Sequence, residues 1–163
     1  MDVELNGHEI LQIAEKIERN GAEFYRKAAV VCGDPAACRL FVKLAQWEAR
    51  HIEIFRQMKQ ELAEQSGEPG RFAPDRLNGL DAQAMAGLAV FGIRAEPDDE
   101  LSGRESRDEI LRMAIEKEKD SIVYYAGLKG FVPREADRDV IADVIQEEMK
   151  HVRILMQSLK RSA

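Results

Sequence analysis

Hydrophobic residues recur at steps of three and four along four long segments of the chain, and this spacing places them on one face of an α-helix. Asn6 with Glu9, and Ser106 with Glu109, have the spacing of a capping box, which is typical of a helix start. We therefore expect helices over about residues 7–31, 35–65, 106–129 and 134–161.

The segment from 66 to 105 does not follow the helical pattern. Glycine and proline cluster near both of its ends, whereas the stretch from Leu80 to Ile93 is apolar, so we interpret the segment as a long crossover containing a short helix. No segment alternates strictly between apolar and polar residues, and no strand is expected. The prediction is an all-α, single-domain chain over residues 1–163, a four-helix bundle of two helical hairpins joined by one long crossover.

The two halves of the chain are similar to each other when they are shifted by one hundred residues. The repeat aligns Ala14 with Ala114, Glu18 with Glu118, Tyr25 with Tyr125, Glu48 with Glu148, and His51 with His151. Such self-similarity is typical of a duplicated structural unit, which we interpret as the helical hairpin.

Charge and composition exclude several classes of partner. The formal net charge is -6, without clustered Lys and Arg, so neither nucleic acid nor an anionic membrane surface is an expected partner. No run of residues is long and apolar enough to span a membrane, and the first ten residues do not resemble a signal peptide, so we expect a cytoplasmic protein. Cys32 and Cys38 are too few for a disulfide framework and are expected to be reduced thiols.

Polar residues interrupt the predicted hydrophobic faces at equivalent places in both halves. Two histidines each follow one glutamate by three residues and another by thirty-three. Residues three apart on a helix lie on the same face, one turn apart. The residues expected to point into the bundle are Glu18, Glu48, His51, Glu118, Glu148 and His151.

One glutamate on such a face is usually paired with Lys or Arg, or points out of the bundle. Four carboxylates at one level of a core would each cost on the order of several kcal/mol to bury, and no cation on the same faces is placed to neutralise them. Two divalent metal ions would balance the four charges, and carboxylate oxygen with imidazole nitrogen suits iron or manganese. Two glutamates and two Glu-x-x-His pairs on four helices form the ligand set of di-iron and di-manganese bundles.

These residues resemble the ferritin-like superfamily and, within it, the stand-alone di-iron domains of the rubrerythrin family, over nearly all of residues 7–160. The most specific matches are the segments Glu18–Tyr25, Leu44–His51, Ala114–Tyr125 and Glu147–His151. The resemblance implies two iron ions per chain, or manganese or a mixed pair. It implies one ion on Glu18 with His51, a second on Glu118 with His151, and bridges from Glu48 and Glu148.

The resemblance also implies a function, the reduction of hydrogen peroxide or dioxygen by a non-haem di-iron oxidoreductase. These 163 residues contain no four-cysteine rubredoxin module, so electrons would come from an external donor such as a rubredoxin-like protein. Ser121 stands where rubrerythrins carry a further glutamate, and His151 where they commonly carry one, so the ligand set is more similar to that of bacterioferritin. Two alternatives stay open: a ferroxidase or iron-handling protein using the same site, and a non-catalytic metal-binding bundle.

Several other residues are expected to have supporting or structural roles. Tyr25 and Tyr125 lie on the faces of the inward glutamates and either orient a ligand carboxylate or are core tyrosines whose hydroxyls reach the bundle edge. Trp47 is expected to be a packing residue. Three roles stay open for the crossover from 66 to 105, namely covering the site, pairing subunits or filling a groove, and its apolar stretch Leu80 to Ile93 favours a homodimer contact. The glutamates expected to be surface charges are Glu15, Glu23, Glu53, Glu116 and Glu147.

Overall fold

The computed structural model describes residues 7–66, 101–132 and 134–161. They form four α-helices: α1 (Gly7–Val31), α2 (Pro35–Ser66), α5 (Arg107–Phe131) and α6 (Glu135–Lys160). Each helix begins and ends within two residues of its predicted limits, and the described ranges contain no strand, so the all-α prediction is confirmed. The predicted cap at Asn6 and the predicted short helix between Leu80 and Ile93 lie outside the described residues.

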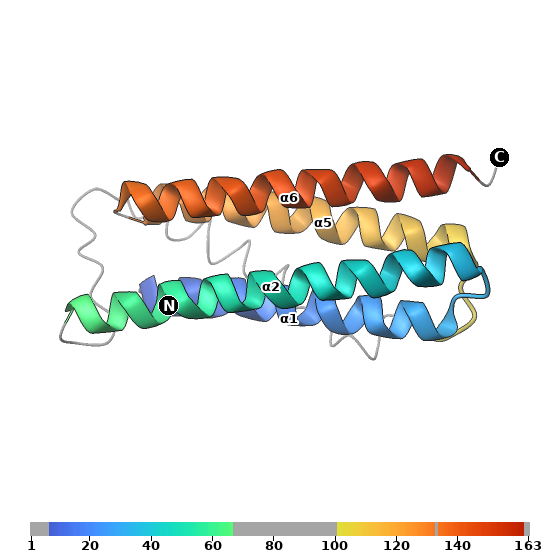
Figure 1. Cartoon of the computed structure of the whole chain (residues 1–163), viewed down its shortest axis with the longest axis horizontal. Helices are drawn as coiled ribbons and strands as arrows, with labels where there is room; N and C mark the ends of the chain where they lie inside the picture. The colour runs from blue at the N-terminus through green and yellow to red at the C-terminus, as the bar shows by residue number, and fades with distance from the viewer. Residues whose placement is uncertain (1–6, 67–100, 133, 162–163) are drawn as a thin grey trace, which may run out of the picture.

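The four helices pack as two antiparallel hairpins, α1 with α2 and α5 with α6 (Figure 1). The hairpins lie against each other so that α1 contacts α5 and α2 contacts α6. Figure 1 shows that α2 ends at the opposite end of the bundle from the start of α5. The two middle helices therefore run in the same direction, which is the arrangement of a bundle with one long crossover.

The starts of α2 and α5 follow from local sequence. Asp34 accepts a hydrogen bond from the backbone amide of Ala37 at 2.7 Å, which satisfies one of the free donors at the start of α2. Ser106 and Glu109 form the predicted capping box at the start of α5, each side chain accepting from the backbone amide of the other residue. The hairpins are thus delimited by sequence signals that act before any tertiary contact forms.

The hydrophobic core has two clusters, which occupy opposite ends of the bundle. The first is built around Phe55, Tyr125 and Ile141, and the second around Phe24, Phe41 and Leu155. On every helix the residues of one cluster precede the inward glutamate and those of the other follow it. The polar level in the middle of the bundle is therefore closed above and below by packed apolar side chains.

No helix in the described ranges combines the length and the apolar character needed to cross a membrane. Cys32 and Cys38 are both free thiols, one buried and the other partly exposed.

Candidate metal centre

All six of the predicted inward-facing polar residues meet at one level in the middle of the bundle. Each of the four helices contributes a glutamate, and α2 and α6 also contribute a histidine one turn further along. Every one of the six is at most 4% exposed to solvent. The residues concerned are Glu18, Glu48, His51, Glu118, Glu148 and His151.

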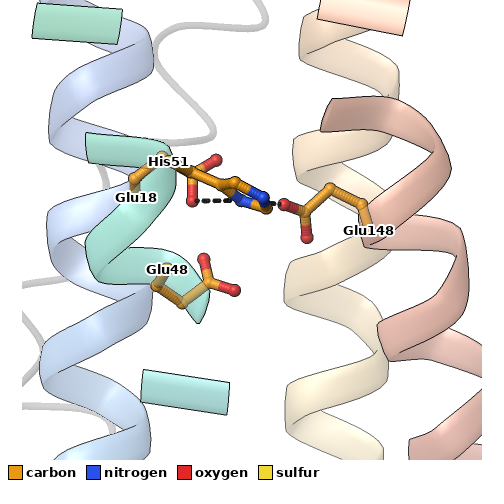
Figure 2. Close-up of side chains that lie close together, drawn as sticks. All are labelled: Glu18, Glu48, His51 and Glu148. Carbon is orange, nitrogen blue, oxygen red and sulfur yellow. Dashed lines mark hydrogen bonds and ion pairs between the residues drawn. The ribbon is translucent and has the colours of Figure 1, made fainter. Parts of the chain in front are cut away.

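The six side chains form two overlapping groups of four, and in each group the potential ligand atoms all lie within 4.8 Å of one another. The first group contains Glu18 and His51, the second contains Glu118 and His151, and Glu48 and Glu148 belong to both. Figure 2 shows the first group, in which Glu18, Glu48 and His51 from the α1–α2 hairpin face Glu148 from α6. Glu48 and Glu148 are thus the residues that both groups share.

Both histidines turn Nδ1 toward the carboxylates. His51 Nδ1 lies 2.7 Å from Glu148 Oε1 and 3.3 Å from Glu18 Oε2, contacts that Figure 2 marks with dashed lines. His151 Nδ1 lies 3.2 Å from Glu148 Oε2 and is also within 3.4 Å of Glu48 and Glu118 oxygens. Glu148 therefore contacts both imidazoles, one with each oxygen.

Close packing of carboxylates and imidazoles shifts the pKa values of both kinds of group. Burial alone would lower the pKa of His51, but its contacts with the carboxylates of Glu148 and Glu18 raise the pKa to about 11. Burial likewise lowers the pKa of His151, and its contacts with Glu118 and Glu148 raise it to about 9. The protonated imidazoles supply positive charge to a cluster that is otherwise entirely acidic.

The pKa values of the buried glutamates shift in opposite directions. Burial and the neighbouring carboxylates Glu18 and Glu118 raise the pKa of Glu48 well above its ordinary value, and burial and the hydrogen bond with Glu148 raise that of Glu118. Burial also opposes ionisation of Glu148, but its contacts with Glu118 and with both histidines lower its pKa. The raised pKa values favour protons on part of this cluster, and divalent cations could replace those protons, since metal ligands must lose their protons to bind.

Two buried oxygens in the cluster accept no hydrogen bond. These are Glu48 Oε1 and Glu148 Oε1, which lie close to histidine nitrogens without the alignment of a hydrogen bond. A buried carboxylate oxygen that accepts no hydrogen bond is energetically costly, and a metal ion is one group that would satisfy it. The donor set of four carboxylates and two imidazole nitrogens suits iron or manganese, so the residues fit a pair of such ions.

The hydroxyls of Tyr25 and Tyr125 donate short hydrogen bonds to carboxylates of the cluster. Tyr25 donates to Glu118, and Tyr125 donates to Glu18, so each tyrosine reaches the glutamate of the opposite hairpin. Both tyrosines are buried, and neither hydroxyl reaches the edge of the bundle. Burial and the nearby negative charges raise the pKa of both well above the ordinary value, which keeps the hydroxyls protonated and able to donate.

Sequence reasoning missed the contribution of Gly21. A Cβ at this position would lie 2.9 Å from Glu48 Oε2, closer than side-chain carbons normally approach another atom. The absence of a side chain at Gly21 therefore makes room for the carboxylate of Glu48. A glycine inside a long amphipathic helix, one turn after Glu18, is the signal that could have identified it.

Two of the predicted surface glutamates have other surroundings. Glu15 is only 7% exposed and binds Lys59 at 2.7 Å and Arg19 at 2.6 Å, so its assignment as a surface charge was wrong. It is buried because the cations from α1 and α2 cover it.

Glu147 has a side chain 43% exposed, and its Oε2 lies 3.1 Å from His51 Nε2. Trp47 packs against the core as predicted, and its ring also stacks on that of His151.

Comparison with known proteins supports the fold. No family model matches the chain, and no curated protein matches it. Among solved structures, the chain is similar to a Thermotoga maritima protein proposed to be a ferritin-like diiron-carboxylate protein, with a TM-score of 0.65, 23% sequence identity and 98% of each chain covered. At this identity the likeness establishes the fold alone and does not single out the rubrerythrin family. The chain therefore has a ferritin-like four-helix fold with a buried cluster of potential metal ligands at its centre.

Proposed function

We propose that this protein is a non-haem di-iron oxidoreductase that reduces hydrogen peroxide or dioxygen with electrons from an external donor. The observation that carries the proposal is the pair of overlapping four-residue groups that share Glu48 and Glu148 in the buried centre of the bundle. An isolated buried acid can be explained by a local ion pair, but two sets of ligands with common carboxylates are the arrangement expected for two neighbouring ions.

Each of the two groups of four residues would hold one ion. Glu18 and His51 would hold one ion, Glu118 and His151 would hold the other, and Glu48 and Glu148 would contact both. Four glutamates and two neutral imidazoles would balance two divalent ions, whether iron, manganese or one of each. When bound in the ferrous state, two irons supply the two electrons that cleave the oxygen–oxygen bond of a peroxide.

The protein's own side chains position the ligands and keep the site dry. Tyr25 and Tyr125 hold Glu118 and Glu18 in place by hydrogen bonds, and the two apolar clusters close the site above and below. Reduction of hydrogen peroxide consumes two electrons and two protons and yields two waters. The electrons must be replaced after each turnover, and we propose a rubredoxin-like protein as the donor.

The proposal also covers the oligomeric state and the cellular location of the protein. We propose that it acts as a homodimer in the cytoplasm. Sedimentation analysis and cell fractionation test these two points independently of the chemistry.

The test of the proposed function is metal content per chain together with turnover. Protein purified without chelators should contain about two irons per chain, as two ligand groups require. Glu48→Gln with Glu148→Gln should lose both ions. A matched control is Glu53→Gln with Glu116→Gln, which removes two exposed carboxylates from α2 and α5 and should keep both ions.

Kinetic measurements on the iron-loaded protein separate the three candidate functions. Peroxide- or dioxygen-dependent oxidation of a reduced donor supports the oxidoreductase. Rapid oxidation of added ferrous iron, with release or storage of ferric iron by a large oligomer, would favour iron handling. Bound iron without either reaction would leave a non-catalytic metal-binding bundle, and absence of bound metal after anaerobic reconstitution with ferrous iron would contradict all three.

A further inference from the structure

The two histidines of the cluster differ in the neighbouring residue, outside the six, that contacts each imidazole. The repeat that aligns the six polar residues also aligns Trp47 with Glu147, the residues that directly precede Glu48 and Glu148. All six residues of the cluster are identical between the two halves, whereas this adjacent position is not. Any difference between the two ion positions must therefore come from residues around the cluster.

Both residues act across the bundle, on the histidine of the other hairpin. Glu147 on α6 places Oε2 at 3.1 Å from Nε2 of His51 on α2. Trp47 on α2 stacks on His151 of α6, with ring centroids 5.1 Å apart and planes 9° from parallel. His51 thus has a carboxylate at the nitrogen that faces away from the cluster, while His151 has an aromatic ring against its face.

These contacts have different chemical consequences. An ionised carboxylate can only accept a hydrogen bond, so Nε2 of His51 is the donor and Nδ1 is left as the nitrogen with a free lone pair when the ring is neutral. Nδ1 is the atom that points at Glu18 and Glu148. The polar contacts of His151 that the structure describes are all made through Nδ1, and stacking on Trp47 holds the ring plane without selecting a tautomer.

We propose that Glu147 is a positioning residue that holds His51 with Nδ1 directed at its ion, and that the half of the site formed by Glu18 and His51 consequently binds its ion more tightly and first. The inference rests on the proposed function only in taking the six residues as metal ligands. Carboxylates that accept a hydrogen bond from a ligating imidazole typically change metal affinity by roughly 10- to 100-fold. Because Glu147 is partly exposed, we expect an effect of about tenfold, at the lower end of that range.

The test uses Zn²⁺, which is diamagnetic and undergoes no redox reaction, in calorimetric titrations of the metal-free full chain. The wild type should bind two ions in distinguishable steps. Glu147→Ala should weaken the tighter step about tenfold and leave the weaker step unchanged. Glu147→Gln retains an acceptor oxygen, so its affinity for the tighter ion should lie between the affinities of the wild type and of Glu147→Ala. Asp143→Ala, an exposed carboxylate one turn earlier on α6, is the control for lost charge and should change neither step.

The mirror substitution tests the same idea from the other half. Trp47→Glu gives His151 the carboxylate that His51 already has. It should therefore tighten the weaker Zn²⁺-binding step and reduce the difference in affinity between the two steps. Proton–nitrogen NMR of the Zn²⁺-loaded wild type should show a strongly hydrogen-bonded, slowly exchanging Nε2 proton for His51, and Glu147→Ala should abolish it while the fold persists.

Three results would overturn the proposal: two equal Zn²⁺ steps in the wild type, equal weakening of both steps by Glu147→Ala, or a His51 Nε2 proton that survives that substitution. Each of them leaves two bound ions and therefore leaves the proposed metal centre standing. Failure of the wild type to bind Zn²⁺ at all would instead contradict the metal centre and this inference together.

Discussion

The α1–α2 hairpin and the α5–α6 hairpin supply the same three polar residues to the cluster but surround them differently. Around the first set lie Glu15, Gly21 and Trp47, and the equivalent places in the second hairpin hold Ile115, Ser121 and Glu147. The buried cluster has thus kept the repeat, while the residues around it have diverged. Equivalent polar residues therefore do not have equivalent surroundings, and each hairpin serves as the internal control for the other.

The largest effect should come from removing what the hairpins share. Two ions, each at about one hundred times its dissociation constant, would stabilise the wild type by roughly 5 kcal/mol in total, so chelation should lower its melting temperature strongly. In Glu48→Gln with Glu148→Gln the chelator should have no effect. Thermal unfolding with and without EDTA measures both.

The same pair of proteins gives a second comparison in the absence of metal. The double variant replaces two buried acids, each with an oxygen that accepts no hydrogen bond, by neutral amides of similar volume. Without metal, however, Glu148 contacts both protonated imidazoles, so the variant leaves two buried cations without their carboxylate and should be less stable than the metal-free wild type. A variant at least as stable as the wild type would mean that Glu148 does not stabilise the metal-free fold.

The next largest effect concerns Tyr25 and Tyr125, each of which donates a hydrogen bond to a glutamate of the other hairpin. The two hairpins are equivalent in this contact. Tyr25→Phe and Tyr125→Phe should each cost about 1–3 kcal/mol, because each leaves a buried carboxylate oxygen without its donor. Denaturant unfolding of the metal-free protein measures the loss. Tyr124→Phe is the control, since Tyr124 donates to the neutral backbone carbonyl of Ile10 at 3.0 Å, and it should cost only about 1 kcal/mol. Clearly unequal losses for Tyr25 and Tyr125 would show that the hairpins differ here too.

Substitution by alanine should lower metal affinity at Gly21 but not at Ser121. Gly21→Ala places a methyl group against Glu48, so metal affinity should fall about tenfold, or about 1.4 kcal/mol. The stability of the metal-free protein should hold or rise, because alanine favours helix by roughly 1 kcal/mol over glycine. Ser121 hydrogen-bonds the backbone carbonyl of Lys117, and Ser121→Ala should leave metal affinity unchanged. Metal titration paired with denaturant unfolding separates the two effects, and a parallel loss of both after Gly21→Ala would indicate general damage to α1.

The smallest effect is a pH dependence confined to the first hairpin. Burial raises the pKa of Glu15, but Lys59, Arg19 and Arg56 outweigh it and hold the pKa below its ordinary value of 4.5. A carboxyl whose pKa is lowered by folding stabilises the protein above 4.5 and loses that contribution as the pH falls through the folded-state pKa. Glu15→Gln should therefore cost about 1 kcal/mol at pH 7, and the difference from the wild type should shrink as the pH drops below about 4.5.

Unfolding measurements across this pH range provide the check, with Glu53→Gln as the exposed control on α2. The control should change the stability by less than about 0.5 kcal/mol at every pH. A Glu15→Gln difference that grows as the pH falls would contradict the assignment of Glu15 to a favourable ion-pair cluster.

Much of the fold and of the cluster was predictable because both depend on short-range periodicity. A helix that places Glu48 on its inner face must also place His51 there, and the repeat extends the argument to Glu148 and His151. The limits of α5 followed from Ser106 and Glu109, whose capping interactions are local.

Residues around the cluster were harder to predict because their contacts join different helices. Glu15 sits at an off-face position of α1 and is buried only because Lys59 and Arg56 on α2 cover it. Glu147 carries no sequence signal that distinguishes it from an exposed glutamate, since its partner His51 is ninety-six residues away. The crossing of the tyrosines between hairpins depends equally on how the hairpins meet.

Local sequence patterns were sufficient to predict the four helices, their pairing into repeated hairpins and the six polar residues directed inward, because helical periodicity and capping act between neighbours in the chain. The tertiary structure was needed to show that Tyr25 and Tyr125 bind the opposite hairpin and that Trp47 and Glu147 contact different histidines. Those contacts depend on the rotation and register of one hairpin against the other, which the packing of two apolar clusters sets and no local pattern encodes.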